Sequence, residues 1–422
     1  MNKINQVKVG NTTYDVDAKT IDGRVLNVSS EAPNNSLGND GDIWFVLESS
    51  EEPEEDKSSG GIEYCPASLP SATEEEFDKH KLYLNNGNMY YLDINNQLGN
   101  GVAEVKVNLN TPRYNHMSAV VGDNIFIFGG VDQSDNVLSS IEKYNITTNT
   151  ITTLSVTLPQ GVCGGTAIAY GSDIYLIGLR TVKSQGSSSS FKDIYKFNTL
   201  DETITVVAQL PYASDYKTTA QLYEGKIYIC NGLTIYAYDI KTTTSTSLGK
   251  VVSISGVGLN SSSIYNGKIY FFGYYRYAGC NVTNIYEYNI SDNVGVDLSS
   301  SSSQYVAKLS VGGTMFGVSS YGKIAYIFGG GYRTSEYNST AGIGLPTIHS
   351  QTVQIFDMSK AGVSTITATE KTGTNCYANL LTTAGSTATT YKDSIYVIGG
   401  YNRPEIFKVQ INVDGYYYKK IN

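Results

Sequence analysis

Charged residues are scarce in this chain of 422 residues, because Asp, Glu, Lys and Arg together make up only 16% of it. The formal net charge is -9, which argues against nucleic acid or an anionic membrane surface as a partner. No apolar run reaches the roughly 18 residues of a membrane-spanning helix, so no membrane insertion is expected. The opening residues, MNKINQVKVGNTTYDVDA, lack the apolar segment of a signal peptide. We therefore predict synthesis in the cytoplasm.

Residues that commonly carry catalysis or bind metals are also few. The five cysteines are far apart and form no CxxC pair, and their odd number fits a reduced compartment rather than a disulfide framework. Only three histidines occur, and no GxSxG, HExxH, phosphate-loop or calcium-loop pattern is present. Of the three, His116 is expected to be a packed, hydrogen-bonded residue. We predict no catalytic residue, no metal site and no cofactor.

Glycine, Ser, Thr, Asn and 35 tyrosines are abundant instead, a composition that favours short strands joined by polar turns. A strand of the type IYxFGG, preceded by a turn residue, recurs six times. The copies are 122–130 (GDNIFIFGG), 171–178, 225–232, 267–273, 322–330 and 392–400. These strands are apolar at nearly every position, which predicts strands that are covered on both faces.

Each copy is followed by a second aromatic strand, such as IEKYN at Ile141 or IYEYN at Ile285. A small-residue strand precedes each copy, and a Thr-rich strand follows most of the aromatic ones. Four antiparallel strands per unit, repeated six times, predict six sheets packed face to face around an axis. The fold class is therefore all-β: a six-bladed β-propeller over residues 103–422 with a small N-terminal β-rich module.

The repeats resemble those of the kelch family of β-propellers. The segment RYNHMSAVVGDNIFIFGG, followed by IEKYNITTNTITTL, is similar to a full kelch repeat over 113–154. The tryptophan usual in the fourth strand of that repeat is absent from every copy, and the only tryptophan, Trp44, precedes the repeats. The resemblance implies a binding propeller, or more rarely an enzyme similar to sugar mutarotases.

Residues 1–102 are predicted to form a separate module of β-hairpins. VKVGNTTYDV is a hairpin candidate around a Gly-Asn turn, and 37–47 and 81–92 are further strand pairs. Residues 48–63 are acidic and poor in apolar side chains, so a flexible loop is expected there. The hairpin motifs GDIWF and LY…NG resemble N-terminal modules of tailed-phage structural and tail proteins. This resemblance implies a phage- or prophage-associated protein, virion-associated or extracellular, assembled into a larger particle through residues 1–102.

Two segments compete for the outer strand of the last blade. AEVKVNLN at 103–110 and GYYYKKI at 415–421 both have strand character, and the sequence leaves the choice open.

Five of the six arginines fall where one rim of the propeller is expected. In a four-stranded blade, the loop after the second strand and the connection to the next blade leave from the same face. Guanidinium groups on that rim would offer paired donors to carboxylate, sulfate or phosphate, and tyrosines would add stacking area. The predicted ligand-binding residues are Arg113, Arg180, Arg276, Arg333, Arg403, Tyr275, Tyr332 and Tyr401.

The function expected from this rim is non-enzymatic binding of an anionic glycan or other anionic surface polymer. A propeller that docks an acidic peptide is an alternative with the same donors. A sugar mutarotase or epimerase is a further alternative, for which rim carboxylates such as Asp193 and Glu405 could act beside an arginine.

Overall fold

The computed structural model contains two compact units, residues 1–98 with 412–422, and residues 99–411. Side chains are described for 103–411, apart from 182–190, 212–217, 252–258, 260, 274–282, 301–304, 332–352, 362–383 and 410. Elsewhere the structure describes the backbone of the strands alone, together with the side chain of Tyr83. Within these residues no helix is long and apolar enough to cross a membrane.

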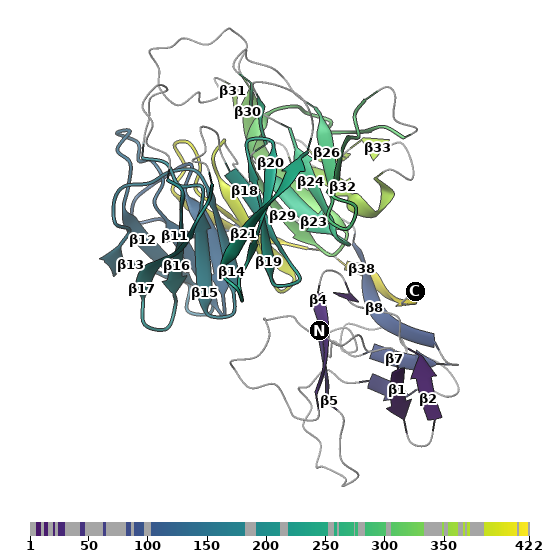
Figure 1. Ribbon diagram of the computed structural model, residues 1–422. Coiled ribbons are helices and arrows are strands. Elements are labelled where there is room, and N and C mark those ends of the chain that lie inside the picture. Colours follow the sequence, from purple (N-terminus) through teal and green to yellow (C-terminus); the bar gives the residue numbers. More distant parts are fainter. Residues whose placement is uncertain are drawn as a thin grey trace. The chain divides into compact units, whose positions relative to one another are not determined.

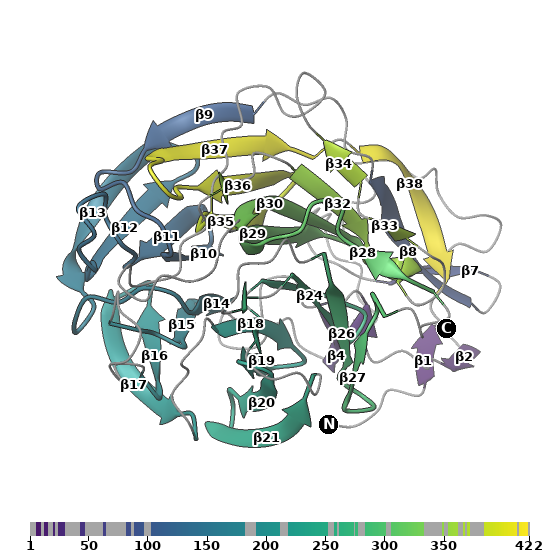
Figure 2. The same ribbon diagram turned by 90° about the horizontal axis from the view of Figure 1, so that it is seen from above.

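Residues 99–411 fold as a six-bladed β-propeller, as the repeats predict (Figure 2). Every blade has four antiparallel strands, which follow one another from the axis outward. Blade 1 contains β10 (Met117–Val121), β11 (Asn124–Phe128), β12 (Ser140–Asn145) and β13 (Thr150–Thr157). Blade 2 contains β14 (Thr166–Tyr170), β15 (Asp173–Ile177), β16 (Asp193–Asn198) and β17 (Thr203–Gln209). Blade 3 contains β18 (Thr218–Tyr223), β19 (Lys226–Asn231), β20 (Thr234–Asp239) and β21 (Thr244–Lys250).

The remaining blades follow the same plan with additions. Blade 4 contains β23 (Ser262–Tyr265), β24 (Lys268–Phe272), β26 (Ile285–Asn289) and β27 (Val294–Asp297). Blade 5 contains β29 (Thr314–Tyr321), β30 (Ile324–Tyr332), β32 (Val353–Asp357) and β34 (Thr369–Lys371), and β31 (Ile348–His349) also pairs with β30. A short 3-10 helix, η2 (Met358–Lys360), follows β32, and β28 (Ala307–Lys308) pairs with β33 (Ile366–Thr367).

The last blade closes the ring with a strand from before the first repeat. Blade 6 contains β35 (Thr387–Tyr391), β36 (Ser394–Ile398) and β37 (Glu405–Gln410), and its outermost strand is β9 (Ala103–Asn108). Figure 2 shows β9 lying along β37 at the edge of the ring. Of the two segments that competed for this position, 103–110 therefore takes it.

The other competitor belongs to the N-terminal unit. β38 (Val413–Lys420) pairs with β8 (Asn88–Asn96), which continues to β7 (Leu82–Asn85) and β6 (Ile62–Tyr64). Residues 412–422 thus lie outside the propeller, and the predicted domain 103–422 is too long at its C-terminal end. The propeller is inserted between two neighbouring strands of another sheet, a pairing between chain ends that no local pattern indicates.

The remaining strands of the N-terminal unit agree only partly with the predicted hairpins. β1 (Gln6–Val9) and β2 (Thr12–Asp15) form the expected hairpin, as do β7 and β8. Within 37–47 the described residues are those of β5 (Ile43–Val46), which pairs in parallel with β4 (Arg24–Ser29). β4 also pairs with β3 (Thr20–Ile21). The predicted loop 48–63 overlaps β6 at its end, and its other positions lie outside the described residues.

The apolar repeat strands are buried because each is covered by a neighbouring blade on both faces. In β11, for example, Ile125, Phe126, Ile127 and Phe128 are all at most 2% exposed. The apolar clusters accordingly span the junctions between blades. Phe126 and Phe128 of blade 1 pack against Phe197 of blade 2, with ring centroids 5.5 and 5.4 Å apart.

Hydroxyl side chains tie the innermost strands together around the axis. Ser118 Oγ of blade 1 lies 2.7 Å from Thr387 Oγ1 of blade 6, and a backbone bond of 2.7 Å from Gly164 to Asn115 joins blades 1 and 2. The other junctions are bridged by the pairs Thr166–Thr218, Thr219–Ser262, Ser261–Phe316 and Ser319–Thr390. The small-residue strands of the sequence therefore fit the limited space at the axis and also form hydrogen bonds between neighbouring blades.

The turns at the outer strands make a second set of ties. Asn149 Nδ2 of blade 1 donates to the Lys106 carbonyl of blade 6 at 3.2 Å, and Asn293 Nδ2 of blade 4 donates to the Leu248 carbonyl of blade 3 at 3.0 Å. Both asparagines have positive φ, at 54° and 56°, a conformation that asparagine tolerates better than most residues. At these two junctions the adjacent blades are thus linked at both their inner and outer edges.

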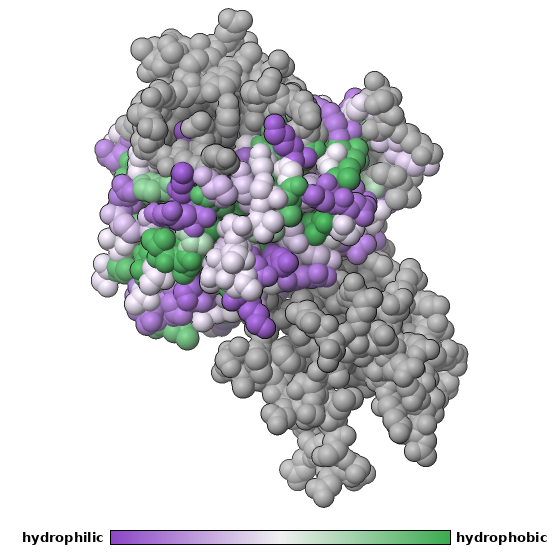
Figure 3. Space-filling model, viewed as in Figure 1, coloured by the Kyte–Doolittle hydropathy of each residue, from purple (hydrophilic) through white to green (hydrophobic). Residues whose placement is uncertain are grey.

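The outer wall of the ring exposes some apolar side chains. The large exposed ones lie on outermost strands or in a turn beside one: Val105, Leu200, Val206, Val294 and Val296. Figure 3 shows such green patches separated by polar residues on the visible wall. Isolated apolar side chains of this kind are normal for a protein surface.

Candidate functional site

The loops that follow the second strands leave from one face of the propeller, which we call the loop face. The connections between blades leave from the same face, and the tight turns lie on the opposite face, which we call the turn face. Figure 1 shows β30 and β31 extending toward the loop face. The five predicted rim arginines all belong to segments of the loop face.

A ring of backbone bridges lies at the loop face, and we call it the collar. In five blades, a residue that follows the glycine at the end of the apolar stretch of the second strand pairs with the connection that precedes the same blade or, in blade 5, with the first residue of its innermost strand. The pairs are Val131 with Tyr114, Arg180 with Cys163, Tyr275 with Gly258, Gly331 with Thr314, and Tyr401 with Ala384. Val131, Arg180, Tyr275, Gly331 and Tyr401 therefore occupy equivalent positions in five blades.

The collar brings several predicted residues into one structural layer. Arg180, Tyr275 and Tyr401 are collar residues, and Arg276 follows Tyr275 in β25 (Tyr275–Arg276), which pairs with β22 (Val257–Gly258). Tyr332, the last residue of β30, follows the collar residue Gly331. The side chains of Tyr275, Arg276 and Tyr332, and the whole of Arg333, lie outside the described part of the chain.

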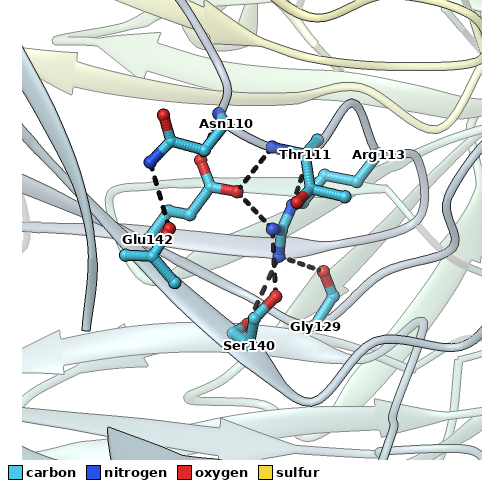
Figure 4. Close-up of polar contacts among 7 residues, drawn as sticks. Asn110, Thr111, Arg113, Gly129, Ser140 and Glu142 are labelled. Carbon is cyan, nitrogen blue, oxygen red and sulfur yellow. Dashed lines mark hydrogen bonds and ion pairs between the residues drawn. The ribbon is translucent and has the colours of Figure 1, made fainter. Parts of the chain in front are cut away.

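Arg113 is a correction to the predicted site, because it is buried at 1% exposure. Its five N–H groups are directed to internal acceptors: the carbonyls of Thr111, Gly129 and Ser140, the Ser140 hydroxyl and the Glu142 carboxylate (Figure 4). Burial lowers the pKa of Arg113, and the neighbouring Glu142 opposes that effect. Arg113 therefore supports the first blade and has no donor left for a ligand.

Glu142 holds the connection into blade 1 as well as the arginine. Its carboxylate accepts the backbone N–H groups of Asn110 and Thr111 at 2.9 and 3.0 Å. Gln354 does the same in blade 5, accepting from Val311 N at 3.0 Å and donating to its carbonyl at 2.9 Å. The signal was visible in the sequence, since Glu142 and Gln354 stand where the other blades have Tyr or Phe in the third strand.

Two tyrosines pack together beside the collar between blades 1 and 6. The rings of Tyr114 and Tyr401 lie edge to face with centroids 5.3 Å apart, over an apolar cluster with Val131 and Cys163. Tyr114 OH donates to Asp135 at 3.1 Å, and burial, followed by this bond, raises the pKa of Tyr114. Tyr401 remains partly exposed and can offer a ring edge to a ligand.

The two described arginines that remain in the predicted site differ in their partners. Arg403 Nη1 lies 3.8 Å from Glu405 Oε1, a loose ion pair with the arginine side chain 27% exposed. Within the described residues, no hydrogen bond or ion pair engages the half-buried Arg180 guanidinium. Arg180 thus retains its full set of donors, in contrast to Arg113.

Carboxylates on the loop face are mostly engaged within the protein. Asp132 accepts three hydrogen bonds from Ser134 and Asn136, which shape the blade 1 loop. Asp193 accepts from Gln209 at 2.6 Å and from Tyr195 at 3.3 Å. These carboxylates thus accept hydrogen bonds from residues of their own blades.

The histidine expected to be structural is indeed packed inside the propeller. His116 is 3% exposed, and its Nε2 lies 2.9 Å from Thr387 Oγ1. In the part of the chain for which side chains are described, no group of three or more His, Cys, Asp or Glu residues could hold a metal ion. Cys163 and Cys230 are buried and form no disulfide with any described residue, and burial raises the pKa of Cys230.

Comparison with protein families gives a match within the first blade. A family model of the kelch motif matches residues 112–150, which span the first three strands of blade 1. The first blade carries a kelch motif. No curated protein matches the chain. A solved structure titled "Structure of YjhT" is 12% identical, with 74% of this chain and 99% of that chain covered at a TM-score of 0.49.

Proposed function

We propose that the propeller is a non-enzymatic recognition domain that binds an anionic glycan or other anionic surface polymer on its loop face. The difference between Arg113 and Arg180 carries this proposal. Both arginines belong to loop-face segments, but the five donors of Arg113 are satisfied internally, whereas the Arg180 guanidinium has no partner among the described residues. A guanidinium held on a rigid backbone bridge is suited to bind carboxylate or sulfate through paired hydrogen bonds.

The variation of the loops supports the same proposal. The six blades are tied to one another at their inner strands, yet the loop after the second strand ranges from the two residues 232–233 to the twenty residues 333–352. Variable loops on a rigid scaffold are where binding specificity commonly lies. Tyr401 beside Tyr114 would supply apolar contact to the flat face of a sugar.

We also propose that the N-terminal unit attaches the propeller to a larger, phage-like particle. The hairpin of β7 with β8 contains the LY…NG motif, one of the two on which the phage resemblance rests. The other motif, GDIWF, contains β5, which pairs in parallel with β4 and forms no hairpin with it. Both chain ends contribute to this unit, so the propeller is presented as an insertion with its loop face built from the middle of the chain. Tail or baseplate genes beside the coding gene would support this assignment, and their absence would count against it.

A glycan array tests the binding function. The intact protein should bind acidic glycans at low salt and lose binding as ionic strength rises, because exposed ion pairs are screened. Arg180→Gln should weaken that binding by about 1.5–3 kcal/mol, as for a charged hydrogen bond, with little change in thermal stability. Lys241→Gln, an exposed lysine on the turn face, is the matched control and should change neither.

Three outcomes would contradict the proposal. A folded protein that binds no acidic glycan at low salt would refute glycan recognition. A stoichiometric protein partner recovered from host lysate, displaced by an acidic peptide, would favour the alternative of peptide docking. Faster exchange between sugar anomers in NMR spectra would instead identify an enzyme of the mutarotase class.

A further inference from the structure

Blade 3 is the one described blade without a loop-face loop. β19 ends at Asn231 and β20 begins at Thr234, and these two residues pair across a turn of only Gly232 and Leu233. In the other blades the segment between the second and third strands is longer: 129–139, 178–192, 273–284, 333–352 and 399–404. The loops that surround the axis are therefore interrupted over blade 3.

The strand ends at this turn carry a row of polar side chains. Asn231 pairs with Thr234, and Thr234 pairs with Lys250, so the three side chains lie on successive strands toward the outer edge. Asn231, Leu233 and Thr234 are half-buried, and Lys250 is exposed. Because neighbouring strands are about 4.8 Å apart, this row extends about 10 Å, which is longer than a single sugar ring.

The row lies on the blade between those that carry Arg180 and Arg276, two of the predicted anion-binding residues. Blade 3 lies between blade 2, whose collar residue is Arg180, and blade 4, whose collar segment is β25 with Arg276. The backbone of the turn is firmly held, since Gly232 and Leu233 accept hydrogen bonds from Leu259 and Val251. A ligand crossing blade 3 would thus meet a fixed surface with positive charge at its outer end.

We infer that the site binds a chain of several acidic sugars and that this chain leaves the axis across blade 3. This inference rests on the proposed glycan-binding function and adds the ligand's size and path. An inner sugar unit contacts Arg180, the hydroxyl group of Thr234 meets a sugar hydroxyl, and Lys250 binds an outer carboxylate or sulfate. A compact ligand would make no use of the Lys250 end of the row.

Length-graded oligogalacturonates and sulfated dextran fragments test this inference with the intact protein. Affinity should rise with chain length until the chain spans the row, and then level off. Lys250→Ala should weaken binding of the longest fragments about two- to fivefold, the range expected for one exposed ion pair, and leave the shortest unchanged. Lys250→Glu should weaken it further.

Lys241→Ala is the matched control, because Lys241 is an exposed lysine of the same blade on the opposite, turn face. Replacing Gly232–Leu233 with the longer loop 129–139 of blade 1 should block long fragments and spare short ones. Equal affinity for short and long fragments would overturn the inference while leaving the glycan-binding function intact. Equal losses in the Lys250 and Lys241 variants would also overturn it, and no binding of any fragment would refute the function itself.

Discussion

Replacing Glu142 with alanine should destabilise the propeller strongly. The change leaves the buried Arg113 guanidinium without a counter-charge and removes the acceptor of the Asn110 and Thr111 N–H groups. Both side chains of the ion pair are fully buried, and breaking a buried pair by removing one partner costs about 3–5 kcal/mol. Thermal unfolding should therefore shift down by several degrees or more.

A second variant separates the charge from the hydrogen bonds. Gln354 holds the connection into blade 5 with a neutral amide, so an amide can do this task when no arginine is present. The double variant Arg113→Met with Glu142→Gln should consequently be much more stable than Glu142→Ala, and the two single changes should show a large coupling energy in a double-mutant cycle. Lys143→Ala is the control, because Lys143 forms only a half-exposed pair with Glu202 at 3.3 Å and should change stability by about 0.2–1 kcal/mol.

Calorimetry and the near-ultraviolet circular dichroism of the tyrosines are the appropriate measurements. The single tryptophan, Trp44, lies in the N-terminal unit, so tryptophan fluorescence would report the wrong part of the chain. A loss below about 1 kcal/mol for Glu142→Ala would refute the reasoning, since it is the value of an exposed pair rather than a buried one. The reasoning would also be refuted if Glu142→Ala were as stable as the double variant.

Three other measurements test separate features of the propeller. Gly178→Ala should lower the free energy of unfolding in urea far more than Gly225→Ala. Both glycines have positive φ, at 73° and 70°. An added Cβ at Gly178 would lie 2.3 Å from the side chain of a neighbouring threonine, whereas at Gly225 it would meet nothing within 4 Å. Burial raises the pKa of Tyr144 to about 12, so the folded state keeps this proton to a higher pH than the unfolded state does. The free energy of unfolding should therefore fall as the pH rises above about 10. In an absorbance titration, the buried tyrosines should ionise together with unfolding. Arg276→Ala should leave thermal stability within about 0.5 kcal/mol but weaken anion binding by about 1.5–3 kcal/mol, with lysine restoring only part of it.

The six blades could be predicted because each repeat contains its own evidence. A strand such as IYFF in β24 is apolar on both faces, and only a sheet covered on both sides accommodates it. Ring closure could not be predicted in this way. AEVKVN and VDGYYYKK both have strand character, and the choice between them depends on pairing with partners hundreds of residues away.

The arginine rim shows a different limit of the sequence. Arg113 and Arg180 both fall in loop-face segments, and nothing in their immediate neighbours separates a buried arginine from an available one. The distinction comes from β12, where Glu142 replaces the aromatic residue that blades 2, 3, 4 and 6 have at this position. The informative signal was therefore a polar residue, Glu142, at an otherwise aromatic position of the third strand. It identified the ion-pair partner of Arg113 and not Arg113 itself.

Many of the 35 tyrosines serve the junctions between blades. Tyrosine ends the innermost strand in blades 2 to 6, and four of these five residues, Tyr170, Tyr223, Tyr265 and Tyr391, pack into the apolar clusters that join adjacent blades. Tyr391 also donates a hydrogen bond to Asp123 in the turn of blade 1. Packing between blades therefore accounts for several of these tyrosines, and tyrosine abundance by itself does not indicate a binding surface.

The way the blades are joined explains why the loop face is free to vary. Every junction has an inner tie made by short side chains or backbone of the innermost strands, and several have an outer tie such as Asn149 to Lys106. The ties at the outer edge use turns of the opposite face, so they place no demand on the loops after the second strands. Blade 3 can dispense with its loop because its turn is held by Val251 and Leu259 instead. A gap in the surrounding loops is thus compatible with a closed ring, as the proposed path of a chain-like ligand across blade 3 requires.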